Sequence, residues 1–114
     1  MCLVESDCFT IAPNLPLSNF PKVNLYVYDG DHSEQAQYDA IVKFWHTLDS
    51  VCIIVIDDWN WKTVRTGTTR GLEAVGATVL FQYCSYIATD IEITPTLFMK
   101  DDYWNGISIF VVSK

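Results

Sequence analysis

Three aspartates lie where two apolar segments end, a spacing that is compatible with a cation site and also with helix caps. Asp29 follows the segment 23–28, and Asp57 and Asp58 follow the segment 51–56. If the two segments are neighbouring parallel strands, about 4.8 Å apart, these carboxylates converge at one edge of a sheet. Carboxylates that close repel one another, and a hard divalent cation such as Mg²⁺ relieves the repulsion. Alternatively, the aspartates cap the helices that follow, because Asp is common before a helix.

A histidine and three tryptophans lie in or beside the predicted loops. His32 is either a general base or hydrogen-bonding group at the mouth of the crevice, or a solvated or hydrogen-bonded turn residue. Trp59, Trp61 and Trp104 either wall a substrate pocket or close the core.

The elements that position these residues alternate between strand and helix. Residues 23–28 are rich in β-branched and aromatic side chains and end at an Asp-Gly turn. Ser33 is a good N-cap for an amphipathic helix over about 33–48. The continuous apolar run 51–56 predicts a strand buried on both faces. Together these segments predict a βαβ unit, in which a right-handed crossover joins two parallel strands.

The rest of the chain predicts one further helix and more strands. We expect a helix over about 61–75, capped by Asn60 and ended by Gly76. The stretch of about twenty residues before the last strand is typical of a lid, a binding loop or a disordered segment. The remaining expected segments are a short strand at 3–5, a loop at 12–22, and an antiparallel strand pair at 78–86 and 107–112.

The composition predicts a single globular domain, residues 1–114, and argues against several classes of partner. Half of the residues are hydrophobic and 18% are charged, which is enough apolar material for a packed core. The formal net charge of −7 disfavours binding to nucleic acid or to an anionic membrane surface. The sequence contains neither the roughly 18 apolar residues of a membrane helix nor the features of a signal peptide. We therefore expect a cytoplasmic protein with no nucleic-acid or membrane partner.

Four cysteines could form disulfides, but no pair has the CxxC spacing. Two of them lie inside apolar strand-like runs, which favours free buried thiols over disulfides or metal ligands. The four are Cys2, Cys8, Cys52 and Cys84.

Two segments resemble class I S-adenosylmethionine-dependent methyltransferases. They read Val-Asn-Leu-Tyr-Val-Tyr-Asp-Gly-Asp-His-Ser at 23–33 and Ile-Val-Ile-Asp-Asp-Trp-Asn-Trp-Lys-Thr-Val-Arg-Thr-Gly-Thr at 54–68. The Asp-Gly-Asp-His-Ser turn, followed by a strand that ends in paired acids, is most similar to the metal-dependent branch that acts on small molecules. Trp-Asn-Gly at 104–106 also resembles that branch, and the likeness extends from residue 3 to residue 112.

The resemblance implies the fold and the roles of the candidate residues. The fold would be a truncated Rossmann-like half-domain, with a parallel βαβ unit and a C-terminal antiparallel strand pair. The implied cofactors are S-adenosylmethionine and Mg²⁺. The roles are cofactor binding for Asp7, Cys8 and Asp29, magnesium binding for Asp29, Asp57 and Asp58, catalysis for Asp29 and His32, and substrate binding for Trp59, Trp61 and Trp104.

One part of the family pattern does not occur in this sequence. The family's Gly-rich turn, GxGxG, and the strands on either side of it have no counterpart. Without them the strand 23–28 has an open edge that invites pairing with another chain. We therefore expect a methyltransferase-like domain that cannot methylate alone and needs a chain supplying the missing half. The alternatives are a non-catalytic module that forms a homodimer or larger homo-oligomer through this edge, and a cation-binding protein of unrelated chemistry.

Overall fold

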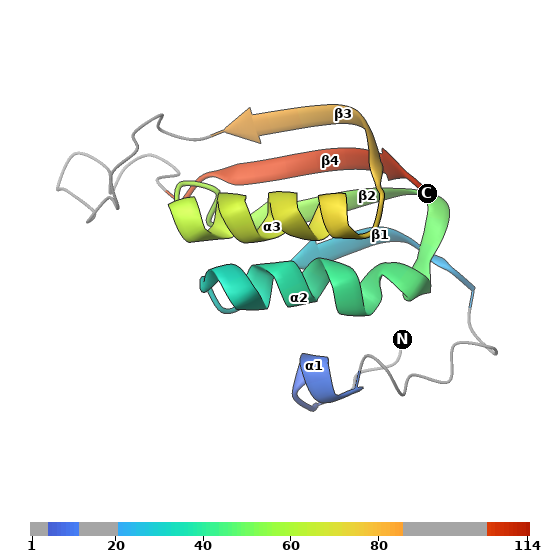
Figure 1. Ribbon diagram of the computed structural model, residues 1–114, viewed down its shortest axis with the longest axis horizontal. Coiled ribbons are helices and arrows are strands. Elements are labelled where there is room, and N and C mark those ends of the chain that lie inside the picture. Colours follow the sequence, from blue (N-terminus) through green and yellow to red (C-terminus); the bar gives the residue numbers. More distant parts are fainter. Residues whose placement is uncertain (1–4, 12–20, 86–104) are drawn as a thin grey trace, which may run out of the picture.

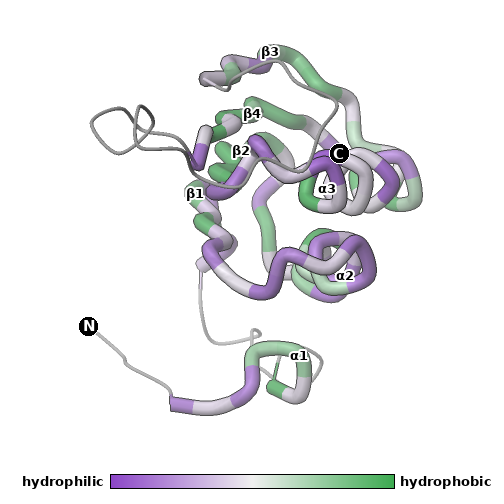
Figure 2. Tube along the Cα trace, turned by 90° about the vertical axis from the view of Figure 1, so that its left-hand side faces the viewer, coloured by the Kyte–Doolittle hydropathy of each residue, from purple (hydrophilic) through white to green (hydrophobic). Residues whose placement is uncertain are grey.

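The computed structural model describes residues 5–11, 21–85 and 105–114. Four strands form one sheet, and two helices pack on one of its faces (Figures 1 and 2). In chain order the elements are α1 (Cys8–Ile11), β1 (Val23–Tyr28), α2 (Glu34–Phe44), the 3₁₀ helix η3 (Trp45–Thr47), β2 (Leu48–Asp57), α3 (Lys62–Ala74), β3 (Thr78–Ser85) and β4 (Ile107–Ser113).

The sheet has the strand order β1-β2-β4-β3 and mixed strand directions. The strands β1 and β2 are parallel, with Tyr28 beside Ile56 at their carboxyl ends. The strand β4 is antiparallel to both of its neighbours, β2 and β3. The predicted parallel βαβ unit and the predicted antiparallel pair are both confirmed, and the fold is α/β.

The helix α2 starts as the sequence predicts and ends earlier. The Ser33 hydroxyl accepts a hydrogen bond from the backbone N–H of Ala36, and Glu34 supplies a negative charge in the first turn. The predicted helix end at residue 48 is wrong, because the chain tightens into the 3₁₀ helix η3 after Phe44. The Thr47 hydroxyl donates to the Phe44 carbonyl oxygen at 2.7 Å. Leu48 is only 1% exposed and already belongs to β2.

Only one face of β2 is buried, so the prediction of a doubly buried strand is wrong. Cys52, Ile54 and Ile56 are buried on the face that packs against the helices. On the other face, Val51 is 51% and Ile53 is 40% exposed. Both α2 and α3 lie on the same side of the sheet (Figure 2), and no element among the described residues covers the opposite side.

The helix α3 packs closely on α2 through its glycines. A Cβ atom on Gly67 would lie 2.7 Å from Gln37 Cβ, so the two backbones can approach only because this side chain is absent. Gly76, with φ of 69°, follows the C-cap residue of α3 and ends the helical segment, as predicted. The N-cap is Trp61 rather than Asn60, because the Asn60 N–H donates to the Asn105 carbonyl oxygen and the chain turns once more before the helix.

Several predictions concern residues outside the described part of the chain. The strand candidate at 3–5 and the loop at 12–22 lie there for the most part, as do Trp104, Cys2 and nearly all of the long stretch before β4. Cys8, Cys52 and Cys84 are free thiols, and of these Cys52 is fully buried. Among the described residues, no helix has the length and apolar character needed to cross a membrane.

Candidate functional site

The three aspartates converge at the carboxyl ends of β1 and β2. One carboxylate oxygen from each of Asp29, Asp57 and Asp58 lies within 4.8 Å of the other two. Asp29 is exposed, Asp57 is half-buried and Asp58 is buried. The predicted convergence is confirmed. The capping alternative does not describe these side chains, because the N-caps of α2 and α3 are Ser33 and Trp61.

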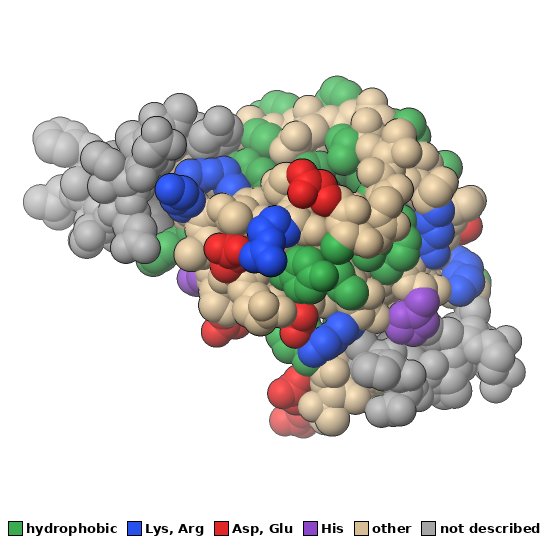
Figure 3. Space-filling view, viewed as in Figure 1, with side chains coloured by type: hydrophobic (Ala, Val, Ile, Leu, Met, Phe, Trp, Pro, Cys, Tyr) green, Lys and Arg blue, Asp and Glu red, His purple; other side chains and the backbone are tan. Residues whose placement is uncertain are grey.

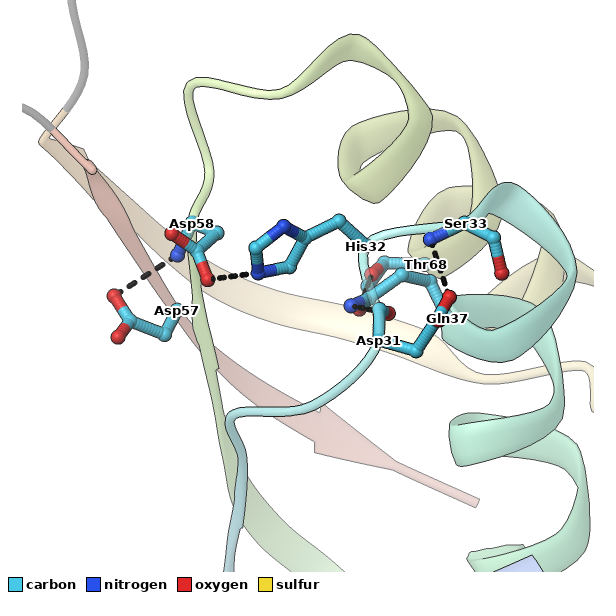
Figure 4. A network of polar contacts seen from close by, with 7 residues as sticks. All are labelled: Asp31, His32, Ser33, Gln37, Asp57, Asp58 and Thr68. Carbon is cyan, nitrogen blue, oxygen red and sulfur yellow. Dashed lines mark hydrogen bonds and ion pairs between the residues drawn. The ribbon is translucent and has the colours of Figure 1, made fainter. Parts of the chain in front are cut away.

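The backbone turns sharply at Asp58 and directs its carboxylate toward His32. Asp58 has a φ of 56°, in the left-handed region that Asp and Asn tolerate better than most residues. Its N–H donates to Asp57 Oδ1 at 2.9 Å, which fixes the turn. Asp58 Oδ2 lies 2.7 Å from His32 Nε2 (Figure 4). The His32 ring also stacks on Trp61, with 5.3 Å between ring centroids. His32 is thus held between the loop after β1 and the loop after β2.

Burial raises the pKa of Asp58 above its ordinary value. The nearby His32 lowers this pKa, while the negative charges of Asp57 and Asp29 raise it further. The raised pKa of Asp58 reflects in part its repulsion by the two neighbouring carboxylates. A bound cation would relieve this repulsion.

Replacing Asp58 with asparagine should raise the melting temperature at pH 7 in buffer containing EDTA. The stability contributed by Asp58 is full below its unfolded-state pKa, about 3.9, and is lost as pH rises through the higher folded-state pKa. The asparagine side chain would not ionise, could still accept from His32, and tolerates a left-handed backbone. The gain should therefore grow from pH 3 to pH 7 in thermal melts.

The matched control is Asp49→Asn, which removes the same charge at the other end of β2, where no such cluster exists among the described residues. Loss of stability in Asp58→Asn at pH 7 would show that the ionised carboxylate is a structural anchor for His32.

A buried polar network holds the His32 loop against both helices (Figure 4). Gln37 is 2% exposed, and its Nε2 donates to the Asp31 carbonyl oxygen at 2.9 Å. Thr68 donates from its hydroxyl to Gln37 Oε1 at 3.4 Å, and the Ser33 N–H donates to Asp31 Oδ1 at 2.7 Å. The sequence analysis did not identify this network. Its signal was a polar residue, Gln37, on the face of a helix that also carries buried Ala40 and Ile41.

A pocket of about 460 Å³ opens beside the carboxyl end of β1. It brings together Asp7, Cys8 and Asp29, the three residues that the resemblance assigns to cofactor binding. The short helix α1 positions the first two, because Asp7 Oδ1 accepts from the Phe9 N–H at 2.8 Å and so caps this helix. The residues lining the pocket are Asp7, Cys8, Phe9, Val27, Tyr28, Asp29, Gly30 and Asp31.

Two aromatic rings in this pocket were not singled out from the sequence. Phe9 and Tyr28 have ring centroids 6.3 Å apart, and Tyr28 is the last residue of β1. Burial raises the pKa of Tyr28 to about 12, so its hydroxyl stays protonated at neutral pH. The alternation of β1 places Tyr28 on the helix side of the sheet, which is the signal that could have indicated this position.

The described tryptophans divide between the core and the site. Trp59 is 4% exposed and meets Phe110 edge-on, with centroids 5.4 Å apart, as the core interpretation expects. Trp61 is half-buried beside His32 and is the one described tryptophan at the acidic cluster. Arg65 fixes the loop between them, since its Nη1 donates to the carbonyl oxygens of Trp59 and Asn60 at 2.8 and 2.7 Å.

The chain was also compared with known proteins. No family model, no curated protein and no solved structure matches it.

Proposed function

We propose that this chain is a methyltransferase-related α/β domain that binds the adenosine part of S-adenosylmethionine and a magnesium ion. The observation that carries the proposal is the position of Asp29. This residue lines the pocket at the end of β1 and also belongs to the cluster with Asp57 and Asp58. A cofactor site and a cation site that share one side chain are what the sequence resemblance leads one to expect.

The acidic cluster fits magnesium by its chemistry. Carboxylate oxygens are the ligands that this ion prefers, and it commonly keeps several waters besides one or two carboxylates. Asp29, Asp57 and Asp58 would hold it, and His32 would keep Asp58 in place while remaining near enough to act on a substrate proton. Magnesium, when bound, lowers the pKa of a substrate hydroxyl. Trp61 is the described aromatic residue that would meet such a substrate.

The pocket fits the adenosine part of the cofactor but offers no binding contacts to the rest of the cofactor. Its volume lies in the range of small-ligand sites, and Phe9 and Tyr28 offer apolar surface for a base. The Asp7 carboxylate offers an acceptor for an exocyclic amino group. The methionine part of the cofactor has no Gly-rich turn in this sequence to receive it. The proposal therefore includes a polypeptide that supplies these contacts beside the outer edge of β1, where the described residues provide no further strand.

The arrangement of the sheet supports this proposal. The strands β1, β2 and β3 run in the same direction, and α2 and α3 lie on one face, as in half of a Rossmann-like sheet (Figure 1). In open sheets of that kind, ligands bind beyond the carboxyl ends of the strands. Both the pocket and the acidic cluster lie at that edge.

Calorimetric titration with S-adenosylmethionine, with and without MgCl₂, tests the proposal. We expect heat of binding in both conditions and a higher affinity with magnesium. Asp29→Asn should lose the magnesium effect and weaken binding of the cofactor, because it alters both sites. Asp49→Asn, with the same loss of charge at the far end of β2, should behave as the wild type does.

Thermal melts provide the second measurement, since a ligand present at 100 times its Kd stabilises the folded state by about 2.7 kcal/mol. No binding heat and no stabilisation by either ligand in the wild-type chain would refute the proposal. No methyl transfer is expected from the chain alone.

A non-catalytic binding module is the second candidate function. The observation that favours it is the outer edge of β1, which has no partner strand among the described residues. Such an edge pairs readily with another chain. A homo-oligomer that gives no heat with S-adenosylmethionine or magnesium would favour this second function over the first.

A further inference from the structure

The side of the sheet away from the helices carries an uncharged apolar surface, here named the apolar face. The strand register aligns its side chains in two rows that cross all four strands. The first row consists of Leu25, Ile53, Val111 and Phe81, and the second of Val27, Val55, Ile109 and Tyr83. Val51 extends the surface along β2.

The apolar face is as large as the largest apolar patches that typical monomers expose. Leu25, Val27, Phe81 and Tyr83 are 54–59% exposed. With Val51 and Ile53, which are 51% and 40% exposed, they offer on the order of 600 Å² of apolar surface, close to the roughly 800 Å² that each partner buries in a stable complex. The helix side, in contrast, presents charges of both signs (Figure 3). A contiguous apolar surface of this size marks an interaction site.

The apolar face can receive a second copy of this chain despite the negative charge of the protein. The chain carries a net charge of −7, so two copies repel unless their contact excludes the acids. None of the residues in the two rows is charged. By the alternation of β2, Asp49 and Asp57 lie on this same side of the sheet, beyond the two ends of the rows. Pairing through the edge of β1 would leave the apolar face in water, whereas stacking the two sheets covers it.

We infer that the protein is a homodimer in which the two apolar faces pack against each other, about 10 Å apart. The two-fold axis runs across the strands, between the rows, and sets each row against the other row of the partner. Phe81 then meets Tyr83 of the partner subunit, and the two symmetry-related aromatic contacts lie together at the β3 edge of the interface. This axis also places the two acidic clusters at opposite ends of the dimer, where they repel least. Val27 also lines the pocket at the end of β1, so the contact borders both pockets of the dimer.

Light scattering at several concentrations tests the dimer directly. The wild-type chain should have twice the mass of 13.0 kDa. Phe81→Lys should halve that mass, because it places two ammonium groups inside the contact. Gln82→Lys is the matched control and should remain dimeric, because Gln82 is exposed on the same strand but directed to the helix side, where its Nε2 donates to Ser108.

Circular dichroism of each variant establishes that it is folded. If Phe81→Lys does not fold, Leu25→Lys, on the opposite edge strand and 55% exposed, provides the test instead. A monomeric wild-type chain, a dimer that persists in both folded lysine variants, or open-ended aggregation would each overturn the inference. A monomer would show that a second copy does not cover the face. A persistent dimer would place the interface elsewhere, for example at the edge of β1.

Discussion

Replacing Ile54 with alanine should lower the free energy of unfolding by about 2–5 kcal/mol. Ile54 is 0% exposed and lies in β2, between β1 and β4, under the two helices. Because the side chains that surround Ile54 are also tightly packed, they cannot move in to fill the space that the lost atoms leave. Small domains are stable by only about 5–15 kcal/mol, so this change removes a large part of the total. Urea unfolding followed by tryptophan fluorescence measures the loss.

The neighbouring residue provides the control for this prediction. Ile53 lies on the same strand, is 40% exposed and belongs to the apolar face. Ile53→Ala removes the same atoms, so at a protein concentration low enough to dissociate any dimer it should cost clearly less than Ile54→Ala. Equal losses in the two variants would mean that both faces of β2 are covered in solution.

Replacing Gly67 with alanine should destabilise the protein by about 1–3 kcal/mol, although alanine is the better helix former. The new methyl group would lie 2.7 Å from Gln37 Cβ and would also press on the backbone of Glu34. The helices α2 and α3 would have to separate, which would strain the hydrogen bond between Thr68 and Gln37. Thermal unfolding monitored by circular dichroism measures this loss.

The contrast with Thr69 isolates the steric cause. Thr69 is exposed on the same helix, so Thr69→Ala should leave stability unchanged or raise it slightly through helix propensity. If Gly67→Ala stabilises the protein as Thr69→Ala does, the close approach of α2 and α3 is not present in solution.

The local elements of this fold could be predicted from the sequence because local chemistry determines them. Ser33 with Glu34 predicts the start of α2, the apolar run through Ile54 predicts β2, and Gly76 predicts the end of α3. The prediction for the end of α2 was less accurate. Asp49 and Ser50 resemble a helix terminator, but they are in fact strand residues. Their conformation depends on the pairing of β2 with its neighbours, which is a tertiary effect.

The acidic cluster could be predicted because the parallel βαβ unit fixes where its strands end. Topology alone brings Asp29 beside Asp57 and Asp58. The contact between His32 and Asp58 could not be predicted, because it depends on the left-handed backbone of Asp58. The apolar face was also missed. A continuous run such as 51–56 has apolar residues on both sides whether or not a second layer of the same chain covers them.

The shared position of Asp29 has a thermodynamic consequence for the proposed sites. One side chain that faces both the pocket and the cation cluster makes the two binding equilibria linked rather than independent. Any factor by which magnesium tightens nucleoside binding must equal the factor by which the nucleoside tightens magnesium binding. The cation concentration at which the domain loads would then depend on how much nucleoside is present, and the domain would respond to the two ligands jointly.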